Sequence, residues 1–412
     1  MAAPEYRLHT FSNGLRMVHK RVGGTRLVHL GYVINAGSRH DGAHPGLAHC
    51  FEHMMFKGTE KRKAIHVLNR LETVGGELNA FTTKEITSIY ASVMTAHFSR
   101  AAELLTDVAF HSTFPEHELK KEKQVITEEI NLYLDTPEEN IYDEFQEMVF
   151  RDHPLAGNIL GTPESVKAMQ REDMVAFRAS HYGSLNTVFA VVGNISFERA
   201  IRTLQPLMEA IPAYANGNGR QQQTLHYKPE SRSTETEFVQ GYAIMGCPAY
   251  ASDDKQRWPM NLLNNLLGGP GLNSRLNLAI REKYGFTYSV ESGYAAFGDT
   301  GMFHCYVSSD KAHLMRAVSL IEKELAKLRE KPLGTLQLHN ARNQLCGQIV
   351  MADENRSGLM MHLGKHIVQR GSAESLDQVL KHIQNISAAQ LTEVAREVFD
   401  PARLSYLLYL PA

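Results

Sequence analysis

Two histidines and two glutamates supply the residue types that metal-assisted hydrolysis requires. His49 and His53 are four residues apart in the run HCFEH, so on a helix both imidazoles lie on one face and can reach one metal ion. Glu52 stands next to His53, where its carboxylate can hold a water molecule at that metal, and Glu129 offers the carboxylate of a third ligand. Catalytic zinc sites combine three protein ligands with an open fourth position. The set therefore predicts a zinc peptidase in which Glu52 is the general base.

The hydrophobic pattern predicts the elements that position the HCFEH run. A buried strand is expected over residues 27–36, followed by a polar loop. Pro45 suits the first turn of a helix that carries the histidines and ends by Gly58. Residues 77–93 are rich in Thr, Ile, Tyr and Phe and predict two short strands.

A second helix is expected to bring the acidic ligand. Residues 115–133 have helical periodicity, and Glu122 and Glu129 lie seven residues apart on that helix, two turns along nearly the same face. By this spacing alone, one glutamate can bind the metal while the other lies behind it.

Length and composition set the class of protein. With 412 residues, 43% of them hydrophobic and 21% charged, the chain predicts a soluble globular protein with material for two domains. A net charge of −2 offers no basic field for nucleic acid or an anionic membrane, so neither is expected as a partner. Residues 1–7 lack the apolar core of a signal peptide, no apolar run approaches about 18 residues, and no Cys-x-x-Cys pair occurs. We therefore expect a cytoplasmic protein with reduced thiols.

An internal repeat predicts two copies of one fold. Gly31-Tyr32 recurs about 210 residues later as Gly241-Tyr242, and the segment 96–101 matches 312–317 at four of its six positions. We predict an α+β protein of two homologous domains related by internal duplication, each a mainly antiparallel sheet packed with helices. The polar, glycine-rich composition after residue 214 predicts a linker. The expected boundaries are a catalytic zinc-binding domain at 1–214, a linker at 215–235 and a degenerate second domain at 236–412.

The segment Gly46–Thr59 resembles the helix signature of the pitrilysin, insulin-degrading and mitochondrial processing peptidase family, whose zinc motif is inverted. The resemblance covers nearly the whole chain and is greatest to the short bacterial relatives of the processing peptidase. The segment 122–129 is similar to the family's second acidic segment. The resemblance implies that Glu129 binds one zinc ion per chain, that Glu122 supports a ligand histidine, and that Glu128 lies on the opposite side of the helix.

Two further segments resemble substrate-binding parts of that family. Residues 75–82 are similar to its edge strand, where extended peptide adds to the sheet, which implies contacts from Asn79, Ala80 and Phe81. The segment 281–288 is similar to its Arg and Tyr pair, which implies that Arg281 and Tyr288 bind and polarise the scissile carbonyl. The resemblance further implies a homodimer that encloses unfolded peptides in a chamber, with this pair supplied either by the same chain or by the partner.

The second half departs from the motif, so one half is expected to catalyse and the other to complete the site. Met260 stands near the position equivalent to His49, so the second half is not expected to bind zinc. Relatives of this fold also serve as non-catalytic scaffolds or as partner subunits, and this is the alternative function. Such chains usually lose parts of the zinc motif, so its presence here disfavours the alternative. The run Gly268–Gly271 lacks the Lys-Ser/Thr pair of a phosphate-binding loop and is expected to be flexible or to contact substrate.

Overall fold

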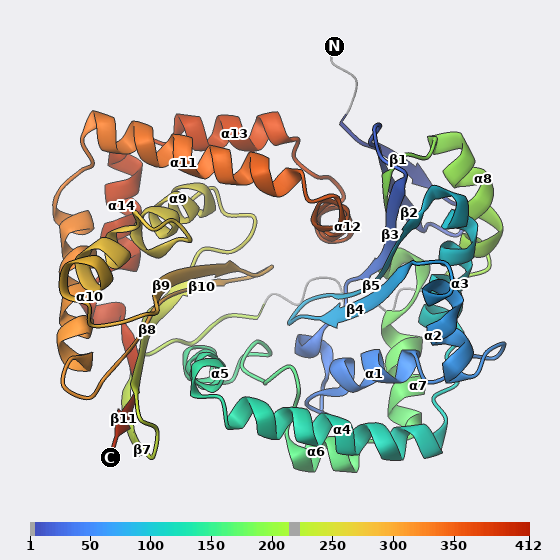
Figure 1. Cartoon of the computed structure of the whole chain (residues 1–412), viewed down its shortest axis with the longest axis horizontal. Helices are drawn as coiled ribbons and strands as arrows, with labels where there is room; N and C mark the ends of the chain where they lie inside the picture. Colours follow the sequence, from blue (N-terminus) through green and yellow to red (C-terminus); the bar gives the residue numbers. More distant parts are fainter. Residues whose placement is uncertain (1–4, 214–222) are drawn as a thin grey trace. The chain divides into compact units, whose positions relative to one another are not determined.

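Two β-sheets organise the chain, one in each of two units (Figure 1). The computed structural model describes residues 5–213 and 223–412. The first unit comprises residues 5–131, 157–213 and 351–375, and the second comprises residues 132–156, 223–350 and 376–412.

The first sheet has six strands in the order β1-β2-β6-β3-β5-β4. Its pairs are antiparallel except for β2 with β6. The central strand β6 is fully buried because both faces of the sheet are covered, and its sequence TVFAVVG is accordingly apolar throughout. The strands are β1 (Arg7–Thr10), β2 (Arg16–Arg21), β3 (Leu27–Ile34), β4 (Glu77–Thr82), β5 (Thr87–Met94) and β6 (Thr187–Gly193).

The second sheet repeats this topology with five strands in the order β7-β11-β8-β10-β9. It again contains one parallel pair, β11 with β7, beside antiparallel pairs. Gly75 and Gly285 end corresponding helical segments with φ angles of 69° and 68°. The predicted duplication and the α+β class are therefore confirmed. The strands are β7 (Ser231–Thr236), β8 (Gly241–Ala249), β9 (Val290–Ala296), β10 (Gly301–Ser309) and β11 (Ser405–Pro411).

Helices cover one face of each sheet with residues from the same half of the chain. In the first unit these are α1 (Leu47–Met55), α2 (Ala64–Glu72), α3 (Phe98–Phe110), α7 (Arg171–His181) and α8 (Phe197–Met208), whose apolar side chains share one core with the sheet. The short helix α6 (Pro163–Ala168) adds Val166 to this core. In the second unit they are α9 (Arg257–Gly268), α10 (Leu314–Glu330) and α14 (Ala388–Val398), with α13 (Leu376–Asn385) packed on α9.

The opposite face of each sheet is covered by a helix from the other half of the chain. α12 (Arg356–Arg370) packs on β6 and β3 of the first sheet, and α5 (Pro137–Val149) packs on β8 and β11 of the second. The connections run through α4 (Glu116–Leu134) and α11 (Thr335–Asp353), each of which begins in one unit and ends in the other.

This exchange of helices differs from the contiguous halves expected from the sequence. An internal repeat shows which segments resemble one another, but it does not show which copy of the sheet a helix covers. The expected linker also differs in part: residues 215–222 lie outside the described residues, whereas Ser231–Thr236 forms the edge strand β7, paired with β11.

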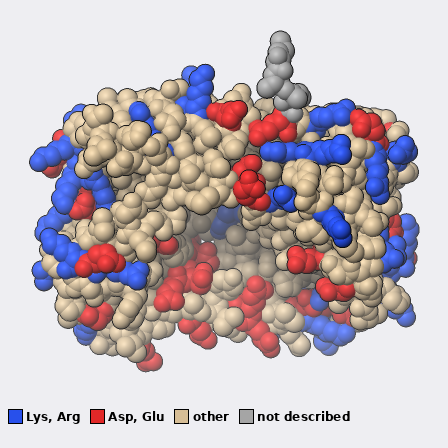
Figure 2. Space-filling model, turned by 45° about the horizontal axis from the view of Figure 1, so that its top comes forward, with Lys and Arg blue, Asp and Glu red and all other residues tan. Residues whose placement is uncertain are grey.

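Charged side chains of both signs are mixed on the face of the molecule shown in Figure 2. Among the described residues, no helix combines the length and the apolar character needed to cross a bilayer.

Candidate metal centre

Helix α1 presents the HCFEH run because its start is fixed by the preceding loop. Gly46 is the N-cap, with a left-handed φ of 88°, and the helix begins at Leu47. Pro45 therefore precedes the helix. The prediction that Pro45 lies in the first turn is wrong by two residues. The buried carboxylate of Asp41 accepts hydrogen bonds from the backbone N–H groups of Gly46, at 2.7 Å, and Ala48, at 2.8 Å. These bonds satisfy N–H groups that the first turn cannot pair internally.

The structure brings His49, His53 and Glu129 together. The Nε2 atoms of His49 and His53 lie 3.8 Å and 3.7 Å from the same carboxylate oxygen, Oε2 of Glu129. Among the described residues, this is the one group of three His, Cys, Asp or Glu side chains whose donor atoms lie within 4.8 Å of one another. α1 contributes the two imidazoles and α4 contributes the carboxylate.

The donor set fits a zinc ion. Tetrahedral zinc with ligand distances of about 2.1 Å separates its ligand atoms by roughly 3.4 Å, slightly less than the distances found here. Burial, and next the neighbouring His53, lower the pKa of His49 to about 3, so its imidazole is neutral near pH 7 and able to bind a metal. The Nδ1 atom of His49 is buried and has no hydrogen-bond partner among the described residues.

Glu122 lies behind the cluster, where it contacts His53. Its Oε2 atom accepts a hydrogen bond of 3.1 Å from Nδ1 of His53, which leaves Nε2 of that imidazole directed at Glu129. Its Oε1 atom lies 2.7 Å from Nζ of Lys57. Such outer contacts fix the tautomer and orientation of a metal-binding histidine. Glu128 is exposed on the surface of α4.

Glu52 is half-buried beside the cluster, and burial raises the pKa of its carboxyl group. Its Oε2 atom accepts a hydrogen bond of 2.5 Å from the hydroxyl of Thr82, at the end of β4. This bond partly opposes the effect of burial. The carboxylate therefore faces the meeting point of α1 and β4.

The expected peptide-binding residues lie on β4, the last strand of the first sheet. One edge of β4 has no strand partner among the described residues. The backbone N–H of Ala80 donates to the side chain of Asn79, at 2.8 Å, and is therefore not used in pairing with β5. Phe81 packs on the opposite face of the strand, beside Tyr90.

Arg281 and Tyr288 lie together in the second unit, where they line one cavity of about 330 Å³. Arg281 lies in the π-helical segment Asn277–Glu282, and the Tyr288 side chain is 90% exposed. The Gly268–Gly271 run lines the same cavity. On α9 of this unit, Met260 is fully buried and part of the core.

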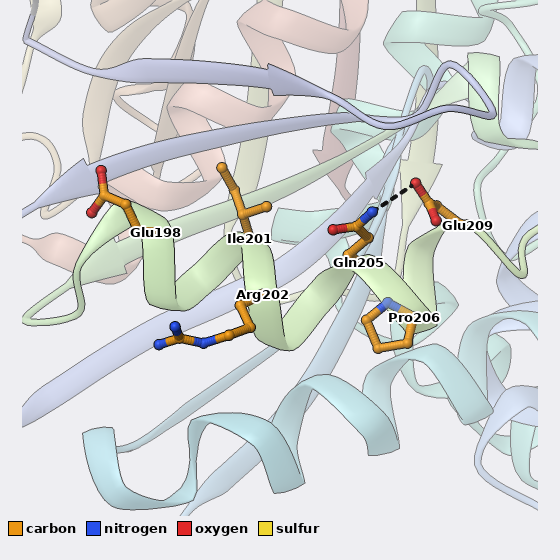
Figure 3. Close-up of a pocket in the computed structure, with 6 residues that line it drawn as sticks. All are labelled: Glu198, Ile201, Arg202, Gln205, Pro206 and Glu209. Atoms are coloured by element: carbon orange, nitrogen blue, oxygen red, sulfur yellow. Dashed lines mark hydrogen bonds between the residues drawn. The ribbon is translucent and has the colours of Figure 1, made fainter.

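Two other surface cavities contain none of the predicted site residues. One follows α8 and is lined by residues of that helix and its C-cap, with Ile201 and Pro206 between charged neighbours (Figure 3). The other lies beside α2 and α3 and is lined by Arg62, Arg70 and Arg100, with Glu103 accepting from the first two. Neither cavity is lined by His49 or His53.

Sequence reasoning missed three residues that contact the surroundings of the cluster: Asp41 at the start of α1, Lys57 at Glu122 and Thr82 at Glu52. Of these three residues, only Lys57 could have been found from the sequence, because it follows His53 by four residues, about one helical turn. Asp41 and Thr82 act across loops and strands, where spacing along the chain carries no information about contact.

Comparison with known proteins identifies the family. Residues 16–163 match the family model described as insulinase (peptidase family M16), and residues 168–345 match the model described as peptidase M16 inactive domain. An uncharacterized zinc protease of Bacillus subtilis is 31% identical over 95% of each chain. Another, of Streptomyces coelicolor, is 32% identical over 95% of this chain and 87% of its own length.

Solved structures share the fold across the whole chain. A structure described as a peptidase M16 inactive domain from Pseudomonas fluorescens has a TM-score of 0.91 and 20% identity, covering 99% of this chain and 98% of its own. A protease from Helicobacter pylori has a TM-score of 0.89 and 20% identity, covering 99% of this chain and all of its own. The cluster of His49, His53 and Glu129, the duplicated sheets and the full-length relatives agree: the chain belongs to peptidase family M16, the insulinase family.

Proposed function

We propose that this protein is a zinc metalloendopeptidase that cleaves unstructured peptides, with one zinc ion held by His49, His53 and Glu129. The observation that carries this proposal is the approach of all three donor groups to within 4.8 Å, with Glu52 next to them on the same helix. Its full-length relatives bear the name zinc protease, which supports the metal and the class of reaction.

When bound, zinc supplies Lewis acidity, which activates water for attack and polarises the scissile carbonyl. Glu52 takes a proton from the attacking water and delivers it to the departing amine. The raised pKa of its buried carboxyl group suits a residue that must both accept and release a proton. Glu122 keeps Nε2 of His53 directed at the metal position.

Peptide is proposed to bind in extended form along the free edge of β4. Main-chain hydrogen bonds to the outward-directed backbone groups of the segment Asn79, Ala80 and Phe81 would hold it independently of its sequence, and this mode of binding requires an extended peptide. Arg281 and Tyr288 are proposed to bind the carbonyl oxygen as negative charge develops on it, and removing one such donor commonly costs about 100-fold in kcat or more.

The decisive experiment compares the wild type with Glu52→Gln on a quenched fluorescent peptide, with both proteins checked for equal zinc content. Loss of the general base is expected to lower kcat by about 100-fold to 10,000-fold. Wild-type activity that survives in Glu52→Gln contradicts the assigned base. Absence of activity in the wild type, over several unrelated peptides, favours the scaffold or partner-subunit function.

A homodimer is proposed as the working form, since one chain carries both the zinc-binding residues and the Arg281 and Tyr288 pair. Sedimentation as a monomer at working concentration contradicts it. Mixing Glu52→Gln with an Arg281→Ala, Tyr288→Phe double variant separates two arrangements. Activity recovers in the mixed dimer if the partner supplies the pair, and it does not recover if each chain uses its own.

A further inference from the structure

Thr82 connects the edge strand β4 to the glutamate proposed as the general base. Its hydroxyl donates a hydrogen bond of 2.5 Å to Oε2 of Glu52. We propose that Thr82 is a positioning residue, which holds the Glu52 carboxylate in the orientation that proton transfer requires and aligns it with peptide paired to β4. This inference rests on the proposed peptidase function.

The hydrogen-bond pattern assigns the Thr82 proton to Glu52. The one other nearby partner is Oγ1 of Thr87, the cross-strand neighbour, at 3.4 Å. Thr87 is fully buried and donates its own proton to the carbonyl of Ala36, at 2.9 Å. An ionised carboxylate can only accept, so Thr82 must be the donor to Glu52. A hydroxyl-to-carboxylate bond of this length belongs to the strong, charge-assisted class.

The bond engages one oxygen of the carboxylate and leaves the other available. Oε2 of Glu52 is held by Thr82, whereas Oε1 makes no hydrogen bond to another described residue. A base that is fixed through one oxygen keeps the second directed at its proton donor. The barrier to proton transfer is lowered by this kind of preorganisation.

The backbone at Thr82 is fixed, because the turn that follows it is held by hydrogen bonds and an ion pair. Thr83 and Ile86 close the turn through a backbone bond of 2.8 Å. Glu85 pairs with Arg39 at 2.7 Å, and both side chains are about nine-tenths buried. Nζ of Lys84 donates to the carbonyl of Gly157 at 2.6 Å. These contacts fix the backbone that carries Thr82, so its hydroxyl is presented to Glu52 from a defined position.

Strand alternation places Thr82 on the face of β4 that meets α1. Leu78 and Ala80 pack against the core that contains α1, and Thr82 continues this face two residues on. Extended peptide paired to the free edge would run alongside this row of side chains. Its position along β4 would then also set its position relative to the Glu52 carboxylate.

The test compares Thr82→Val, which keeps the shape but lacks the hydroxyl, with Thr82→Ser, which keeps the hydroxyl. Each is measured on the fluorescent peptide beside the wild type, with zinc content and circular dichroism recorded. We expect Thr82→Val to lower kcat about tenfold to 100-fold with KM nearly unchanged and zinc fully retained, since a hydrogen bond to a charged group is lost. Thr82→Ser is expected to stay within about threefold of the wild type. Thr82→Ala serves as a second variant without the hydroxyl if Thr82→Val does not fold.

Three results would overturn the inference. Equal losses in Thr82→Ser and Thr82→Val would show that the methyl group matters and the hydroxyl does not. A rise in KM without a fall in kcat would assign Thr82 to peptide binding alone, and loss of zinc would assign it to the stability of the site. An inactive wild type would instead contradict the proposed function, so the two failures are distinguishable.

Discussion

At Glu129, a single carboxylate oxygen lies within 4 Å of both histidine nitrogens, while the carboxylate of Glu128 is turned to solvent. Glu129→Gln is therefore expected to reduce bound zinc to well below one ion per chain, because it removes the one anionic ligand of the set. Glu128→Gln, which makes the same chemical change one residue away, is expected to retain zinc fully. Metal analysis after dialysis measures both. Full zinc in Glu129→Gln would refute its assignment as a ligand.

The carboxylate of Glu122 lies one contact further from the proposed metal position. Glu122→Gln keeps a hydrogen-bond acceptor for Nδ1 of His53 but removes the charge, and it leaves Lys57 without its partner at 2.7 Å. We expect zinc affinity to weaken about tenfold to 100-fold, as is common for such outer contacts. Competition with a chelator measures the affinity. Glu118→Gln is the control, since Glu118 pairs with Lys121 at the surface of the same helix, and equal losses in both variants would contradict the role of Glu122.

For individual residues, the sequence predicted the contacts that depend on spacing within one helix. Four-residue spacing on a helix places His49 and His53 on one face, and seven-residue spacing relates Glu122 to Glu129. Contacts made between elements were not predictable. The hydroxyl of Thr82 reaches Glu52 because β4 packs against α1, and no pattern in the sequence predicts that these two elements are in contact.

Among the elements, α12 packs closely against the first sheet. A Cβ atom added at Gly364 would lie 2.6 Å from Cγ2 of Val33, a stiff and fully buried side chain of β3. Gly364→Ala is expected to force α12 away from the sheet and to lower stability by about 1–3 kcal/mol. Calorimetry measures this as a lower unfolding midpoint of the first unit.

Gly358→Ala on the same helix is the matched control. Its Cβ would meet the nearest side chain, that of Asn355, at 3.4 Å, an ordinary contact distance. Because alanine favours helix, this variant is expected to be neutral or to gain up to about 1 kcal/mol. Equal destabilisation by both substitutions would show that close packing of α12 on the sheet is not the cause.

A buried histidine on β10 predicts how the second unit responds to acid. Burial lowers the pKa of His304 to about 4, and its ring packs edge-on against Tyr142 of α5. Between pH 6.5 and pH 4 the unfolded chain binds a proton at this position that the folded chain does not. The contribution of neutral, buried His304 to the free energy of unfolding is therefore fully present above pH 6.5. As the pH falls below 6.5, the free energy of unfolding decreases by at most about 1.4 kcal/mol per pH unit.

The measurement compares the unfolding midpoints of the wild type and His304→Gln between pH 4 and pH 8. Trp258 is the one tryptophan of the chain and lies on α9, so its fluorescence reports the second unit. The wild type is expected to lose stability more steeply than the variant below pH 6.5. Parallel curves for the two proteins would contradict the assignment to His304.

For the molecule as a whole, the sequence predicted the class of fold and the duplication but not the exchange of α5 and α12. Apolar periodicity identifies a helix that covers a sheet, whereas the choice of sheet depends on connections that cross the whole chain. α4 and α11 make those connections, and each belongs partly to both units.

The exchange predicts that a cut between residues 214 and 222 leaves the molecule in one piece. The N-terminal fragment retains α5, which belongs to the second unit, and the C-terminal fragment retains α12, which belongs to the first. A specific protease site introduced there, followed by cleavage and size-exclusion chromatography, is expected to give two fragments that elute together. Separate elution of two folded fragments would contradict the exchange of helices.

Placement of α12 near the end of the chain also has a consequence for synthesis on the ribosome. The strands that α12 covers are complete at Gly193, but the helix itself ends only at Arg370. At about 5–20 residues per second, this interval lasts roughly 9–35 s. During that time the apolar face formed by Val33, Val188 and Ala190 has no cover from the chain's own sequence. We therefore expect the nascent first half to expose this face to chaperones that bind apolar surface until α12 has been made.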